Sequence, residues 1–163
     1  MKQLTLLVLS LGITVTSFAA NASDQSDSQA LASARAKMDV ELALAPVKTA
    51  NDLTNYMAAH RDGSAFDQLS PLNKELFLRS LTFDNHGLSS FNYAALSGLK
   101  PAQVYQVLGI FGMQSMTTDT LQRNGVRTNA TGITPLLEPL KGYRCAGGHT
   151  CMTDDTAACT SNC

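Results

Sequence analysis

Apolar residues recur at three- and four-residue steps along much of the chain, which is the spacing of one face of an α-helix. The first such stretch covers residues 29–45, and Pro46 ends it. A second begins after Thr49, which can cap a helix with Asp52 in its first turn, and Gly63 ends it. We therefore predict two amphipathic helices in this part of the chain.

Two further helices have clear starts, because each begins with a proline at a position where the missing N–H costs nothing. Pro71 opens the first, with Ser70 as its cap, and Pro101 opens the second. Between these helices we expect a polar turn over 84–87 and a short helix over 90–97. The apolar faces of the two proline-started helices predict a shared core made of Leu76, Phe77, Leu81, Val104, Leu108 and Phe111.

The pattern weakens over residues 113–131. This stretch fits one more helix or a threonine-rich β-hairpin that turns at the Asn-Gly pair 124–125, and we favour the helix. The tail, residues 141–163, holds all the cysteines and few large apolar residues, so disulfides must supply the order that a core cannot. The pattern as a whole predicts a mainly α fold, a small bundle of about five to six helices with a short disulfide-stapled C-terminal module.

The first 22 residues have the pattern of a cleavable secretory signal peptide. Lys2 makes the start positive, a short apolar run extends to Val15, and Ala20 and Ala22 are the small residues needed at −3 and −1. The apolar run is too short to span a bilayer. We therefore expect residues 1–22 to be removed, a mature chain without a transmembrane segment, and export to the periplasm or the medium.

Composition limits the partners of the mature protein. Charged residues make up 15% of the chain, the net charge is −1, and the lysines and arginines are scattered. A surface that follows nucleic acid needs clustered positive charge, so nucleic acid is excluded as a partner. The 44% of hydrophobic residues is enough for a packed core. We expect a helical domain over 23–140, a cysteine-rich module over 141–163, and a protein partner in the cell envelope or medium.

The tail has its cysteines at Cys145, Cys151, Cys159 and Cys163. Zinc sites usually show two close cysteine pairs, whereas only the second pair is close here, so we expect disulfides and no metal site. We predict that the first two cysteines lie on a hairpin and the last two on a short helix capped by Thr153. Bridges should then join hairpin to helix, and both of the pairings that do so remain open.

Asp84 and His86 are the polar residues best suited to general base chemistry, because a carboxylate can orient an imidazole. We interpret them as loop residues, since the sequence contains no nucleophile elbow and no H-E-x-x-H motif. His60 and His149 are interpreted as a helix-face residue and a turn residue. We predict no catalytic residue and no cofactor, and an exported binding protein such as an inhibitor, immunity factor or adaptor. The alternative is a small exported hydrolase that uses His86 with Asp84.

Overall fold

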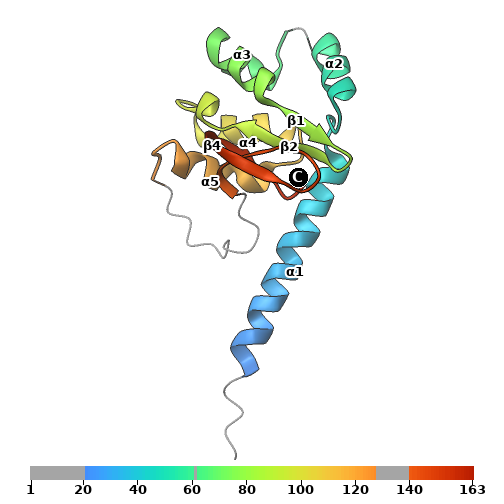
Figure 1. Ribbon diagram of the computed structural model, residues 1–163, viewed down its shortest axis with the longest axis vertical. Helices are drawn as coiled ribbons and strands as arrows, with labels where there is room; N and C mark the ends of the chain where they lie inside the picture. Colours follow the sequence, from blue (N-terminus) through green and yellow to red (C-terminus); the bar gives the residue numbers. More distant parts are fainter. Residues whose placement is uncertain (1–20, 61, 128–139) are drawn as a thin grey trace, which may run out of the picture.

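The computed structural model describes residues 21–60, 62–127 and 140–163. Its helices are α1 (Asn21–Leu44), α2 (Ala50–Ala59), α3 (Pro71–Ser80), α4 (Pro101–Gly109) and α5 (Thr117–Arg123), and its strands are β1 (Thr82–Asp84), β2 (Gly87–Asn92), β3 (Leu140–Cys145) and β4 (Cys151–Cys159). The prediction of a mainly α bundle is wrong, because these strands form an antiparallel sheet and the fold is α+β (Figure 1). Residues 1–20 of the predicted leader lie outside the described residues, and its last two residues begin α1.

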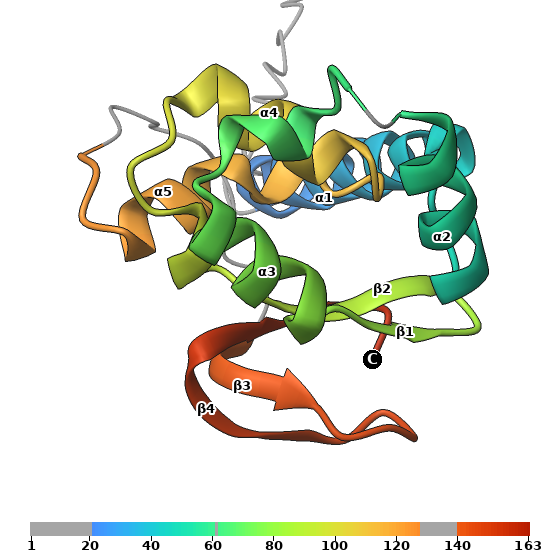
Figure 2. The same cartoon turned by 90° about the horizontal axis from the view of Figure 1, so that it is seen from above.

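The sheet has the strand order β1-β2-β4-β3. β1 and β2 form a hairpin, so the turn over 84–87 connects two strands and not two helices. β4 comes from the cysteine-rich tail and pairs with β2, with Phe91 opposite Ala158, and β3 lies on the other side of β4. Figure 2 shows β4 bending around β3 at the side of the molecule, with the helices on the other side of β1 and β2. The tail is therefore part of the sheet.

The short helix predicted over 90–97 is also wrong. β2 continues to Asn92, and a single 3-10 turn over 94–96 follows it. Every residue of β2 from Gly87 to Phe91 is buried. A strand buried on both faces shows no alternation of apolar and polar residues, and the small polar residues Ser89 and Ser90 further obscure it.

The local signals for helix starts at Thr49, Ser70 and Pro101 are confirmed. The Thr49 side chain accepts a hydrogen bond from the Asp52 N–H at 3.1 Å, and Asp52 Oδ2 accepts from the Thr49 N–H at 3.0 Å, which completes a capping box. The Ser70 hydroxyl caps α3, and prolines open α3 and α4. Residues 113–127 contain a 3-10 turn followed by α5, so the prediction of a helix, rather than a hairpin, is confirmed for this range. Residues 128–131 lie outside the described residues.

The core lies between α3, α4 and β2 and is centred on aromatic rings. Phe77 lies 6.0 to 6.2 Å, ring centroid to centroid, from each of Phe66, Phe91 and Phe111. Of the predicted core, Phe77, Val104, Leu108 and Phe111 are buried and Leu81 is partly buried against them. The prediction for Leu76 is wrong, because this residue is 45% exposed. α3 packs through Phe77 and Leu78, and the Leu72–Leu76 side of the same helix faces solvent.

Candidate functional site

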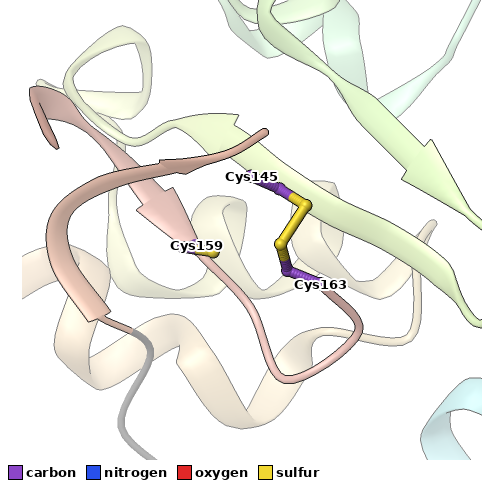
Figure 3. Close-up of side chains that lie close together, drawn as sticks. All are labelled: Cys145, Cys159 and Cys163. Carbon is purple, nitrogen blue, oxygen red and sulfur yellow. A yellow bond between two sulfur atoms is a disulfide. The ribbon is translucent and has the colours of Figure 1, made fainter. Parts of the chain in front are cut away.

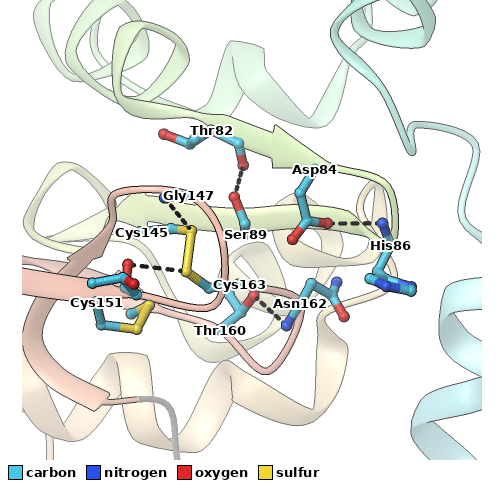
Figure 4. Close-up of a disulfide and its surroundings, with 12 residues drawn as sticks. Thr82, Asp84, His86, Ser89, Cys145, Gly147, Cys151, Thr160, Asn162 and Cys163 are labelled. Atoms are coloured by element: carbon cyan, nitrogen blue, oxygen red, sulfur yellow. Dashed lines mark hydrogen bonds between the residues drawn. A yellow bond between two sulfur atoms is a disulfide. The ribbon is translucent and has the colours of Figure 1, made fainter.

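The turn between β1 and β2 contains the predicted polar pair. Asp84 Oδ1 accepts a hydrogen bond of 2.7 Å from the backbone N–H of His86, and the His86 side chain is exposed (Figure 4). This contact is an Asx-turn, in which a carboxylate stabilises the backbone of its own turn. The Asp84 carboxylate therefore shapes the hairpin through the backbone of His86.

The other histidines lie on different elements. His60 follows the end of α2, where its ring stacks on Tyr56 with centroids 4.2 Å apart. His149 lies in the turn between β3 and β4, with a left-handed φ of 62°. Within the described residues, one cluster of potential metal ligands exists, and it contains cysteines alone.

The cysteine module has the bridges Cys145–Cys163 and Cys151–Cys159. This pairing is one of the two non-local pairings that the sequence left open. Figure 3 shows the Cys145–Cys163 bridge with Cys159 beside it. The prediction that Cys159 lies on a short helix is wrong. Cys159 is the last residue of β4, and it pairs with residues of both β2 and β3.

A bend in β4 explains how Cys151 and Cys159 meet within one strand. A flat strand rises about 3.3 Å per residue, so residues eight apart would be separated by about 26 Å. The two Cα atoms are in fact 6.2 Å apart. The register of β4 with β3 shifts between Thr153 and Ala158, and within this stretch Asp154 Oδ1 accepts hydrogen bonds from the Thr156 backbone N–H at 3.1 Å and hydroxyl at 3.0 Å. These residues were expected to start a helix, but the aspartate forms a turn and the residues after it join the sheet.

The sulfur atoms of the module form a buried cluster. The Sγ atoms of Cys145, Cys159 and Cys163 all lie within 4.8 Å of one another, and all three residues are buried. Cys151 is partly buried and packs against them. Zinc binds thiolates, whereas these sulfurs are joined in disulfides and lack the negative charge of such ligands. The chemistry available to this cluster is thiol–disulfide exchange.

The second candidate site is α1, which projects from the rest of the molecule (Figure 1). Its C-terminal end is anchored, because Leu42 packs against the core and Glu41 Oε2 accepts a hydrogen bond of 3.1 Å from the Ser115 N–H. In contrast, no side chain between residues 28 and 40 is buried. Within the described part of the chain, no helix combines the length and apolar character needed to cross a bilayer.

The projecting part of α1 keeps an apolar stripe. Leu31, Ala34 and Met38 are partly buried and recur at three- and four-residue steps in line with Leu42. The amphipathic pattern predicted this helix but not that most of it would lie away from the core. A signal was present in the sequence, since the stripe is narrow and includes an alanine, which buries little apolar area.

Comparison with known proteins adds no relative: no family model matches the chain, and no significant match was found among curated proteins or solved structures.

Proposed function

We propose that this protein is an exported interaction protein that binds a partner protein through α1. The observation on which the proposal rests is the projection of α1 beyond its anchor at Glu41 and Leu42, which leaves the stripe of Leu31, Ala34 and Met38 outside the core. An amphipathic helix that offers residues at this spacing is a common mode of protein recognition. An inhibitor, an immunity factor or an adaptor would act in this way.

Two features support export to an oxidising compartment. Disulfides persist in the periplasm and outside cells, and two are present in the tail. The leader pattern over residues 1–22 points to the same destination. The partner is then a protein of the cell envelope or the medium.

The alternative hydrolase receives less support from the structure. It needs Asp84 to orient the His86 imidazole as a general base. Asp84 Oδ1 instead accepts from the His86 backbone N–H, which favours a structural role for the aspartate.

Site-specific photo-crosslinking in the producing cells tests the binding proposal. A benzoylphenylalanine at Met38 lies on the apolar stripe, and the same group at Ala36 lies on the opposite side of the same helix. We expect a discrete crosslinked protein from the Met38 position and none from the Ala36 position. Equal crosslinking at both positions, or none at either, would contradict binding through the stripe.

The export proposal has its own test. Ala20 and Ala22 at −3 and −1 give a mature protein that begins at Ser23. The intact mass of the protein recovered from the periplasm or medium should match residues 23–163. Retention of Met1 would contradict the proposal, whereas a start at Ala20 would only move the cleavage site.

A further inference from the structure

The two disulfides of the tail lie close enough to exchange with each other. Cys159 Sγ belongs to one bridge and lies within 4.8 Å of both sulfurs of the other bridge, Cys145–Cys163. A thiolate attacks a disulfide sulfur directly, so a thiolate released at Cys159 needs to move only a short distance to reach the second bridge.

The bridge Cys151–Cys159 is the point where an external thiol can enter. Cys151 is partly buried, whereas the other three cysteines of the module are buried. Cys151 also lies at the mouth of the β3–β4 turn, opposite Cys145 in the strand register, and residues 146–150 of that turn are exposed. Access is a main determinant of which sulfur in a disulfide is attacked.

We propose that the module binds a thiol covalently at Cys151 and that the second bridge keeps the thiol from being expelled. The incoming thiolate forms a bond with Cys151 Sγ, the Cys151–Cys159 bond breaks, and its electron pair stays on Cys159 Sγ. In an isolated disulfide, the Cys159 thiolate would return to Cys151 and release the thiol.

Here the Cys159 thiolate has a second target. It attacks Cys145 Sγ, a Cys145–Cys159 bond forms, and Cys163 leaves as a thiolate. Cys145 and Cys159 belong to paired strands, whereas Cys163 lies beyond the end of β4, so Cys163 is the cysteine of this bridge that the strand ladder does not hold. One thiol is consumed and one thiol appears, so the sequence needs neither an oxidant nor a reductant. The ligand is any accessible thiol, from a small molecule or from a cysteine of a peptide.

Peptide mapping of the full oxidised chain tests this exchange. The protein is incubated with reduced glutathione, quenched with acid, alkylated with N-ethylmaleimide and mapped without reduction. We expect glutathione on Cys151, N-ethylmaleimide on Cys163 and a Cys145–Cys159 link. Glutathione on Cys151 with the alkyl group on Cys159, glutathione on another cysteine, or no adduct would each overturn the proposal.

A matched variant isolates the role of the second bridge. Cys145→Ser with Cys163→Ser leaves Cys159 with no target but the mixed disulfide, so the adduct should fall by about tenfold at the same glutathione concentration. An undiminished adduct would show that the second bridge does not retain the thiol, and the wild-type map decides the matter if this variant does not fold.

A second arm distinguishes the sources of the thiol. An unstructured peptide with a single cysteine replaces glutathione under the same conditions. Adducts with both probes identify a site for thiols in general, and an adduct with glutathione alone identifies a site for small thiols. The test does not involve α1, so its outcome is independent of the partner proposed for that helix.

Discussion

At the scale of single residues, Gly112 is a point where the backbone of α1 comes close to the rest of the molecule. It has a φ of +70°, and a Cβ placed on it would lie 2.6 Å from the Glu41 carbonyl oxygen and 2.7 Å from the Leu42 Cα. Both atoms belong to backbone, so neither can turn aside as a side chain would. The glycine is therefore required by its conformation and by the close approach of α1.

We expect Gly112→Ala to lower the free energy of unfolding by about 3 kcal/mol or more, since a steric clash adds to a left-handed strain of about 1 kcal/mol. Gly98→Ala is the matched control, because Gly98 has a φ of +82° and open space around it. It should lose the strain energy alone. Urea unfolding of both variants measures the difference, and equal losses would show that α1 does not press against Gly112.

Leu108 and Leu76 form a second matched pair. Leu108 is fully buried in the core, and Leu76 is 45% exposed. Leu108→Ala should reduce the free energy of unfolding by about 2–5 kcal/mol, whereas Leu76→Ala should cost less than about 1 kcal/mol. Denaturant titration would reveal a wrong placement of α3 if the order of the two losses were reversed.

Asp67 makes stability depend on acid pH. The Lys74 ammonium donates to Asp67 Oδ1 at 2.7 Å and holds the pKa of this carboxyl below its usual value of 3.8. A lowered folded-state pKa means that the charged form stabilises the fold above the unfolded-state pKa, and that this stabilisation is lost as pH falls through the folded-state value.

Asp67→Asn should therefore be less stable than the natural chain at pH 7, and the difference should shrink at pH 2 as the Asp67 carboxylate takes up a proton. Asp39→Asn, at an exposed position on α1, should change stability little at either pH. Thermal unfolding at the two pH values measures the effect. A loss of the same size at both pH values would mean that the Lys74 contact does not set the acid dependence.

At the scale of elements, helices whose signals are local could be predicted from the sequence. The cap at Ser70 and the prolines at 71 and 101 act within one helical turn, so each signal is contained in a few consecutive residues of the sequence. The strands could not be predicted in this way. β2 exists because β4 pairs with it, and Phe91 and its partner Ala158 are far apart in the sequence.

The features of the candidate sites also differ in whether their signals are local in the sequence. The expectation of disulfides could be inferred from the number of cysteines and the expected compartment. The non-local pairing is confirmed, but it was predicted from a hairpin facing a helix, and strand β4 stands in place of that helix. The bend of β4 could not be inferred, because an aspartate followed by alanines fits a helix start as well as a turn. The projection of α1 depends on where the core ends, which is a property of the assembled molecule.

At the scale of the whole molecule, the tail is joined to the body by its pairing with β2, and its two disulfides link tail residues to one another. Of the described residues after 139, Ala158 alone belongs to the main core cluster, and the cysteines form a separate small cluster. A loop of about 15 residues closed by a disulfide is worth about 3 kcal/mol in the chain-entropy account. Cys145–Cys163, with a separation of 18 residues, is of this size.

Reduction of both bridges should therefore loosen the tail and leave the helical body folded. We expect amide exchange over 140–159 to accelerate strongly, while the helical circular dichroism signal and the protection of α4 are retained. The oxidised protein in the same buffer is the control. Loss of helical signal together with the tail would show that β4 holds the core together.

The position of β4 between β2 and β3 also sets the order of folding events. We expect β2 to form its hairpin with β1 first, because the two strands are close in sequence, whereas its other edge has no partner until residues 151–159 have been made. Pairing across so long a stretch of chain is slow, because the entropy of loop closure opposes it before any contact is gained. During synthesis, β2 presents an open strand edge, which is the kind of surface that joins wrongly with another chain. The need for a chaperone should therefore end when β4 closes that edge.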